Sequence, residues 1–431
     1  MRNKPFIIAF LLFIHVGFWF ILKPAPPFSD DKVYAINAES MVDGHYQLLE
    51  SPKNHRLTVI APTALFIKLF GESPFIVSLW TLLCSLITIA CLFLFLSKYS
   101  TIEVAFTSSF LIACNNLQII YSVALFPDVI VALFAFLVIE LIYTSRIENS
   151  SNLITIIGAT VYFYIGFLAK EIILIILPFI VFLFISDWIK KINKTFWIKF
   201  FISFISGGVI LNAIYYFATG DANFIYHCIN KNHNEVFAIF TNEELIKRFT
   251  YQPLIFLFQS VGYSILLLFF IGYFLSKVGV TNQNKYNQKP GAPLIKFFSI
   301  YFLILLATYW WMPTSFNHLS PILLFGFERM WMLLLIPLAI IAANLLVEAI
   351  EGEGRKKLLL ITAIFFIAAL ISVILSSYNR AFMFLLFSVF SIFSILLKEK
   401  TNLNKQIILS VLLIPVFFVA LYFAYQNSNW R

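Results

Sequence analysis

Residues 5–22 read PFIIAFLLFIHVGFWFIL, an apolar run that contains no Asp, Glu, Lys or Arg. A helix needs about 20 such residues to cross the hydrocarbon core of a bilayer. Similar runs recur to the end of the chain, and about 13 can be drawn, at roughly residues 5–22, 74–97, 102–121, 127–144, 153–169, 171–188, 197–218, 253–276, 296–312, 329–349, 357–376, 381–397 and 405–425. The sequence therefore predicts an all-α polytopic membrane protein with about 13 transmembrane helices.

Composition excludes the main alternatives to a membrane protein. The 431 residues are 61% hydrophobic and 12% charged, and the mean hydropathy is +0.90. Soluble domains carry roughly 25% charged residues, so a soluble enzyme, a disordered chain and a disulfide scaffold are excluded. The formal net charge is +9, but Lys and Arg gather in the cytoplasmic loops of membrane proteins. We therefore expect the lipid bilayer as a partner, and no nucleic acid.

The basic residues also predict an orientation. With the N-terminus in the cytoplasm, most of them fall in cytoplasmic loops, as the positive-inside rule requires. The outer face then receives three loops, at about residues 23–73, 219–252 and 313–328. No soluble domain is expected at the C-terminus.

The first outer loop contains two expected surface helices. Residues 31–43 form the first, which Gly44 can end. Its expected apolar face carries Val33, Ile36, Ser40 and Met41. Residues 57–70 form the second, which stops at Gly71. Both are too short to span a bilayer comfortably, so we expect juxtamembrane helices that cover a cavity between the spans.

Charged side chains occur beside or within the apolar runs at five places, and all five fall on the outer side of this topology. They are Asp30 and Asp31, His55 and Arg56, Asp128, Lys170 and Glu171, and Glu328 and Arg329. An ionised group at membrane depth costs several kcal/mol. Such residues therefore tend to face a cavity or a charged partner.

Each of these places has a structural interpretation beside the functional one. The acids could cap helices, or one of them could act as a general base. Lys170 and Glu171 could form a surface ion pair of little energetic value, or they could place a cation at the mouth of a cavity. The arginines could snorkel to the membrane interface, or they could bind a phosphate group.

The motifs, taken in order, resemble a known family. They are Asp30-Asp31-Lys32-Val33-Tyr34-Ala35, Gly44-His45-Tyr46, Arg56 through Pro62 to Leu69-Phe70-Gly71, Pro127-Asp128, Leu168-Ala169-Lys170-Glu171 and Glu328-Arg329-Met330-Trp331. The chain resembles the GT-C glycosyltransferases, in particular the bacterial relatives of protein O-mannosyltransferases and of lipid A aminoarabinose transferases. Residues 1–190 carry most of the resemblance, and residues 300–340 carry a weaker part.

This resemblance implies a GT-C-like bundle and an inverting transfer of a sugar from a polyprenyl-phosphate donor on the outer face. Asp30 matches the position of the catalytic base, and Asp31 and Asp128 match further acidic positions. The basic residues that match positions suited to a lipid phosphate are Arg56, Lys170 and Arg329. The residues expected to support them are Tyr34, His55, Glu171 and Glu328. The cofactor is left open, with a divalent metal ion at Asp30 or Asp31 as the candidate.

We therefore expect a glycosyltransferase of the bacterial inner membrane. Residues 1–190 would form its catalytic module, and residues 191–431 would supply the remaining helices. It would move a hexose or pentose from undecaprenyl phosphate to lipopolysaccharide, another envelope glycan or a protein. Three other functions stay open: a polymerase or ligase of polyprenyl-linked glycans, a flippase or transporter of a lipid-linked sugar, and a non-catalytic membrane scaffold. A transporter would have functional charges near the membrane midplane.

Overall fold

The computed structural model describes residues 3–51, 53–237, 252–277, 291–311, 328–351, 354–400 and 404–428. Regular structure in these ranges is entirely helical, as predicted. The helices are α1 (Lys4–Leu22), α2 (Asp30–Val42), α3 (Leu57–Phe70), α4 (Pro74–Val77), α5 (Leu79–Tyr99), α6 (Ile102–Ala113), α7 (Asn116–Ser122), α8 (Pro127–Ile147), α9 (Leu153–Ala169), η1 (Glu171–Ile176), α10 (Leu177–Ile189), α11 (Lys194–Thr219), α12 (Phe224–Phe237), α14 (Gln252–Gln259), α15 (Val261–Leu275), α17 (Ala292–Trp311), η4 (Glu328–Leu334), α18 (Leu335–Ile350), α19 (Arg355–Ile374), α20 (Tyr378–Lys400) and α21 (Lys405–Ser428). Much of the expected loop 219–252 and nearly all of 313–328 lie outside the described residues.

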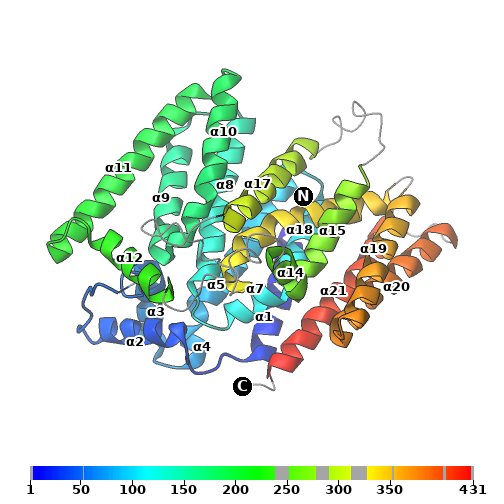
Figure 1. The fold of residues 1–431 in the computed structure, drawn as a ribbon, viewed down its shortest axis with the longest axis horizontal. Helices are drawn as coiled ribbons and strands as arrows, with labels where there is room; N and C mark the ends of the chain where they lie inside the picture. Colours follow the sequence, from blue (N-terminus) through cyan, green and yellow to red (C-terminus); the bar gives the residue numbers. More distant parts are fainter. Residues whose placement is uncertain are drawn as a thin grey trace.

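The chain is a multi-pass membrane protein. Ten helices in the described ranges are long and apolar enough to cross a bilayer, and the bent pair α6–α7 raises the number to eleven. The sequence predicts about 13 spans. Two of the expected runs, residues 153–169 and 253–276, account for the difference, because they form the shorter apolar helices α9 and α15. Figure 1 shows the resulting bundle, with the long helix α11 at one side and α19–α21 at the other.

Hydrogen bonds to distant helices stabilise the break between α6 and α7, where the two helices are bent by 55°. Asn115 Oδ1 accepts from the Leu117 N–H at 3.0 Å and caps α7, while its amide donates to the Gly262 carbonyl at 3.0 Å. The Ala113 carbonyl lies 2.9 Å from Nδ1 of His15. Backbone groups at membrane depth need such partners, because the hydrocarbon offers none.

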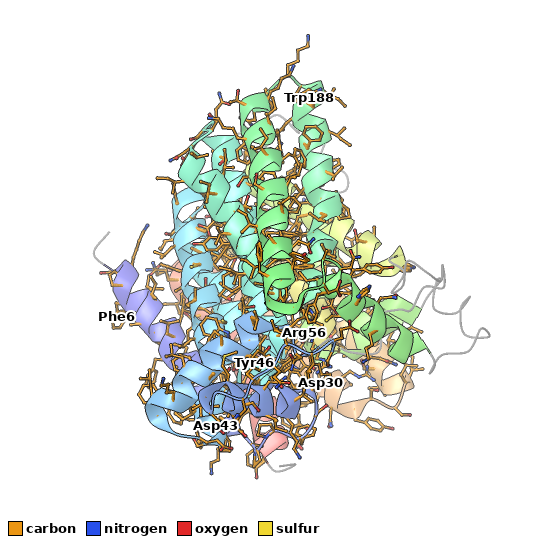
Figure 2. All side chains as sticks on the ribbon, turned by 90° about the vertical axis from the view of Figure 1, so that its left-hand side faces the viewer. Phe6, Asp30, Asp43, Tyr46, Arg56 and Trp188 are labelled. Atoms are coloured by element: carbon orange, nitrogen blue, oxygen red, sulfur yellow. The ribbon has the colours of Figure 1, made fainter. Side chains whose placement is uncertain are left out.

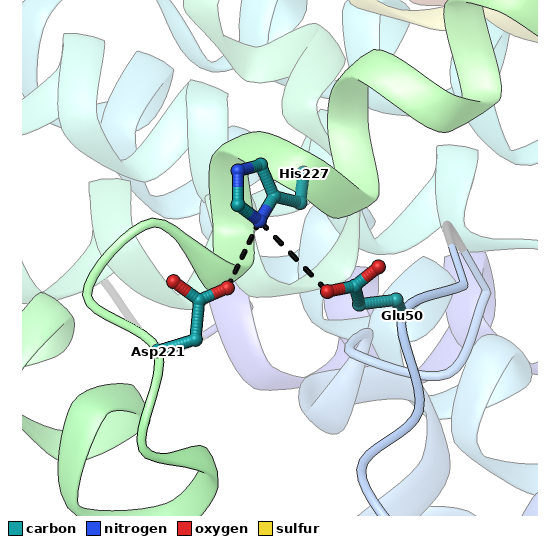
Figure 3. A group of neighbouring side chains, drawn as sticks. All are labelled: Glu50, Asp221 and His227. Carbon is teal, nitrogen blue, oxygen red and sulfur yellow. Dashed lines mark hydrogen bonds and ion pairs between the residues drawn. The ribbon is translucent and has the colours of Figure 1, made fainter.

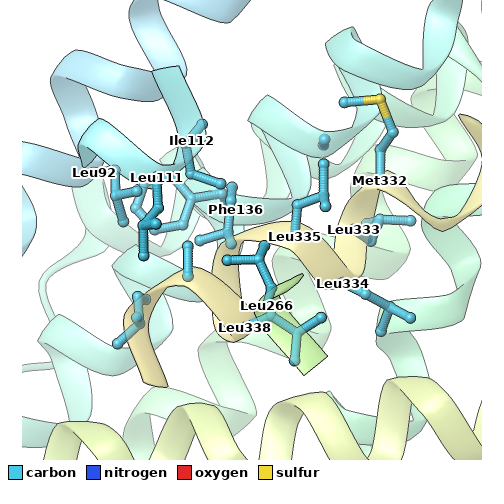
Figure 4. Close-up of a cluster of buried hydrophobic side chains, with 14 of the residues drawn as sticks. Leu92, Leu111, Ile112, Phe136, Leu266, Met332, Leu333, Leu334, Leu335 and Leu338 are labelled. Carbon is cyan, nitrogen blue, oxygen red and sulfur yellow. The ribbon is translucent and has the colours of Figure 1, made fainter. Parts of the chain in front are cut away.

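Helix α18 is the centre of the bundle. Each of its residues from Leu335 to Ile350 is buried. Leucines at its start, together with Met332, pack against residues of α5, α6, α8 and α15 in the cluster that Figure 4 shows. The short helix η4 leads directly into α18, so this packing fixes the position of Arg329 in η4.

Helices α2 and α3 are the two predicted juxtamembrane helices, and they pack against each other. Helix α3 has the predicted bounds, and Gly71 follows it with a φ of +82°, a conformation that favours glycine. Helix α2 packs on the protein through the side that carries Asp31, Tyr34, Ala35 and Ala38, which are buried. Ile36, on the apolar face expected to lie on the membrane surface, is exposed. The contact of that face with the membrane stays a prediction.

Candidate active site

Five helix ends meet on one side of the bundle and bring the predicted charged residues together. They are the beginnings of α2, α3, α8 and η4 and the junction of α9 with η1. In Figure 2, Asp30, Tyr46 and Arg56 lie near one end of the molecule and Trp188 lies at the other. We call the first of these the site end.

The first contact is a buried ion pair between α8 and the end of α9. Asp128 follows Pro127 in the first turn of α8, where a carboxylate is favoured by the helix dipole. Lys170 Nζ lies 2.7 Å from Asp128 Oδ1, and the two side chains are only 8% and 2% exposed. Among the described residues, Asp128 Oδ2 accepts no hydrogen bond. Burial of two charges is costly unless both are well paired, so this pair is sensitive to the loss of either partner.

The second contact joins the first loop, residues 23–73, to η1. Arg56 Nη2 lies 3.1 Å from Glu171 Oε2, and Arg56 Nη1 donates to the Tyr34 hydroxyl. Arg56 is buried, and its Nε donates to no described residue. Burial raises the pKa of Tyr34 to about 12, although the Arg56 charge opposes the rise. The tyrosine therefore stays protonated at neutral pH and holds the guanidinium in place.

The third contact surrounds Asp30, the first residue of α2. Lys53 Nζ lies 2.6 Å from Asp30 Oδ1, and Arg329 Nη2 lies 2.7 Å from Asp30 Oδ2. Burial raises the pKa of the Asp30 carboxyl, but the hydrogen bond from Lys53 and the charge of Arg329 outweigh that effect. The pKa of Asp30 is therefore below its ordinary value, and the group is ionised at neutral pH.

Arg329 connects the third contact to the first. Its Nε lies 3.9 Å from Asp128 Oδ2, and its guanidinium lies 4.4 Å from the centre of the Phe126 ring. Ion-pair contacts thus join Lys53, Asp30, Arg329, Asp128 and Lys170 into one connected set, and the Arg56–Glu171 pair lies beside it. The described members of the site are four cations and three carboxylates. They are Lys53, Arg56, Lys170 and Arg329, with Asp30, Asp128 and Glu171.

Lys170 and Glu171, adjacent in sequence, do not form the surface ion pair that the sequence leaves open. Lys170 pairs with Asp128 and Glu171 with Arg56. The carboxylate of Asp31 accepts the N–H groups of Phe28, Ser29 and Lys32 at 3.3, 2.8 and 3.1 Å. These bonds give it a structural task at the start of α2, and its catalytic role stays a prediction.

The remaining predicted residues are at the same end. His55 is buried, and its Nδ1 lies 3.2 Å from the Ser51 carbonyl. Burial and the neighbouring Arg56 charge lower the pKa of His55, so its ring is neutral at pH 7. Glu328 begins η4, but its side chain lies outside the described part of the structure. Sequence reasoning missed Lys53. The only sequence signal for it is its position three residues before Arg56.

The predicted metal position does not fit a divalent cation. Both Asp30 oxygens contact cationic side chains, and Asp31 Oδ1 is used by backbone N–H donors. A metal ion there would be repelled by Lys53 and Arg329.

Elsewhere in the described ranges, one group of three residues offers metal-ligand atoms: Glu50, Asp221 and His227, shown in Figure 3. His227 Nδ1 lies 2.9 Å from Asp221 Oδ2 and 3.8 Å from Glu50 Oε1. Lys231 in α12 also donates to the Glu50 carbonyl at 3.2 Å. These exposed contacts join the first loop to α12.

Comparisons with known proteins bear on the fold and on one segment of the chain. Residues 57–216 match the family model described as dolichyl-phosphate-mannose-protein mannosyltransferase. The match includes Asp128 and Lys170 but neither Asp30 nor Arg329. No curated protein matches the chain.

Two solved structures match the chain along almost its whole length. ArnT from Cupriavidus metallidurans in the apo state has a TM-score of 0.61 at 12% identity, and ArnT from the same organism bound to undecaprenyl phosphate has a TM-score of 0.63 at 11% identity. In both cases the match covers 98% of this chain and 77% of the other. At such low identity the likeness shows a common fold. The chain therefore has the fold of these ArnT structures, and its residues 57–216 resemble the mannosyltransferase family.

Proposed function

We propose that this protein transfers a sugar from a polyprenyl-phosphate donor to an envelope acceptor, on the extracytoplasmic face of the membrane and with inversion at the anomeric carbon. The observation that carries the proposal is the set of charges at the site end. It combines an ionised carboxylate, Asp30, with four cationic side chains, Lys53, Arg56, Lys170 and Arg329.

The cations suit a phosphate leaving group. As the bond between sugar and phosphate breaks, negative charge grows on the phosphate, and fixed cations in a water-poor site stabilise it. Lys170, Arg56 and Arg329 come from the α9–η1 junction, the first loop and η4, respectively. The buried Nε of Arg56 donates to no described residue, and Asp128 Oδ2 likewise lacks a hydrogen bond from them. Unsatisfied buried groups are costly. A bound phosphate would accept from Arg56 Nε, and a hydroxyl of the bound sugar would donate to Asp128 Oδ2.

Asp30 suits the role of the base. It is 30% exposed, whereas Asp128 is 2% exposed, so Asp30 is the acid of the pair that an acceptor hydroxyl can reach. A carboxylate about 3 Å from that hydroxyl can take its proton. A single displacement with inversion would require this base to act on the face of the sugar opposite the departing phosphate.

The distribution of basic residues supports an extracytoplasmic site. At the end opposite the site end, Lys4 donates to Ser97 at 3.0 Å, Lys98 pairs with Glu148 at 2.7 Å, and Lys277 pairs with Glu348 at 3.0 Å. Lys and Arg accumulate on the cytoplasmic side of membrane proteins. The site end would therefore face away from the cytoplasm.

The names of the similar proteins suggest the chemical class of the donor. One matched ArnT structure is described as bound to undecaprenyl phosphate, and the matched family is described by a dolichyl-phosphate-linked mannose donor. We infer a polyprenyl phosphate carrying a hexose or pentose. The acceptor would be lipopolysaccharide, another envelope glycan or a protein.

The test is a transfer assay with purified protein in lipid nanodiscs, supplied with undecaprenyl phosphate carrying labelled mannose or aminoarabinose and with an envelope extract. We expect label in a glycan, lipid or protein of the extract, with release of undecaprenyl phosphate. Mass spectrometry of the envelope with and without the gene would identify the acceptor. Absence of transfer from every polyprenyl-linked sugar, by protein that is folded, would refute the proposal.

A further inference from the structure

Asp30 is not ready to act as a base in the state that the structure describes. Lys53 donates to Oδ1 at 2.6 Å and Arg329 donates to Oδ2 at 2.7 Å, so each oxygen already contacts a cation. Charge-assisted hydrogen bonds of this length are among the stronger contacts that a carboxylate makes. An acceptor hydroxyl can give its proton to Asp30 only after one of the two contacts loosens.

Arg329 is the contact that the donor can remove. Its guanidinium lies between two carboxylates, 2.7 Å from Asp30 Oδ2 and 3.9 Å from Asp128 Oδ2, and against the Phe126 ring. A guanidinium has five N–H donors in a planar fork, and a phosphate can take two of them at once. Because Lys170 and Arg329 both contact or approach Asp128, a phosphate drawn to Lys170 would arrive within reach of Arg329.

We propose that Arg329 masks Asp30 in the resting protein, and that the donor phosphate unmasks Asp30 by taking over the Arg329 guanidinium. Lys53 remains on the other oxygen and acts as a positioning residue for the base. This inference rests on the proposed function, since it assigns an order of events to the same site. The base becomes available only when a donor is bound.

Under this proposal, a substitution at the catalytic base strengthens binding of the donor phosphate. Asp30 and the donor phosphate compete for one guanidinium, so removing the Asp30 charge should tighten phosphate binding. The apparent Kd equals the intrinsic Kd divided by the fraction of molecules in which Arg329 is released. Loss of one partly exposed ion pair predicts a gain of about fivefold.

The experiment measures binding of undecaprenyl phosphate to the full protein in nanodiscs, by native mass spectrometry or by titration of intrinsic fluorescence. The variants are Asp30→Asn, Arg329→Met and the double variant, with Glu148→Gln at the opposite end as a control. Thermal unfolding checks that each variant is folded, and Arg329→Gln replaces Arg329→Met if the latter is not. We expect Asp30→Asn to bind about fivefold more tightly than the wild type, and we expect that gain to vanish when Arg329 is absent.

Other outcomes overturn the proposal in distinguishable ways. If the gain from Asp30→Asn persists without Arg329, Asp30 repels the phosphate through space and masks nothing. If Asp30→Asn binds no more tightly than the wild type, there is no competition, although the proposed function can stand. If no variant and no wild-type protein binds undecaprenyl phosphate, the proposed function itself fails.

Discussion

Replacing Lys170 by Met should destabilise the protein far more than a similar change at its surface. Lys170 and Asp128 are 2.7 Å apart and 8% and 2% exposed. Loss of one partner leaves the other as a buried, uncompensated charge, which costs about 3–5 kcal/mol. Because Arg329 Nε remains 3.9 Å from Asp128 Oδ2, we expect the lower end of this range, about 3 kcal/mol.

Lys98 provides a matched control for this change. It pairs with Glu148 at the same distance of 2.7 Å, but the two side chains are 58% and 44% exposed. An exposed ion pair contributes about 1 kcal/mol at most. Lys98→Met should therefore cost less than about 1 kcal/mol, as measured by unfolding of both variants in a detergent titration.

A second substitution separates the structural role of the pair from its role in binding. Adding Asp128→Asn to Lys170→Met removes the buried charge, so about 2 kcal/mol of the lost stability should return. Binding of undecaprenyl phosphate should stay weak, because the cation is still absent. The reasoning is refuted if the double variant is no more stable than Lys170→Met, or if Lys98→Met is equally destabilising.

Three further predictions concern catalysis and binding. Asp30→Asn should lower kcat for sugar transfer by about 10²–10⁴, the contribution of a general base, in the labelled-donor assay; full activity would remove Asp30 from that role. Lys53→Met should raise the pKa of Asp30, whose value Lys53 helps to keep low, and so move the acid limb of kcat/KM to higher pH; an unchanged pH profile would contradict the positioning role. Arg56→Met should weaken binding of undecaprenyl phosphate by about tenfold, the loss of one charge-assisted contact, whereas equal affinity would place Arg56 outside the phosphate site.

The fold could be predicted from the sequence wherever local signals decide it. Apolar runs long enough to span a bilayer, and the glycine that ends α3 at Gly71, are visible in the residues themselves. The break between α6 and α7 is different. It is held by a hydrogen bond from Asn115 to Gly262 and by His15 on the freed Ala113 carbonyl. These partners are about a hundred or more residues away in the sequence, and no local sequence pattern predicts them.

The candidate site could be predicted as a set of residues but not as a set of contacts. Charges beside apolar runs are costly, so they identify Asp128, Lys170 and Arg56 as residues that need partners. Which partner each one takes depends on how α8, α9 and η1 pack. In the folded protein, Lys170 forms its ion pair with Asp128 and not with Glu171, its neighbour in the sequence. Lys53 lacked a distinguishing signal, because a lysine in a long polar loop is ordinary in a membrane protein.

The most direct test of the site is a cryo-electron microscopy structure of the protein with undecaprenyl phosphate. We predict that the phosphate lies within hydrogen-bond distance, about 3 Å, of Lys170 and Arg329, and that Arg329 no longer contacts Asp30. A phosphate bound at the opposite end, beside Lys277 and Lys357, would contradict the assignment of the site.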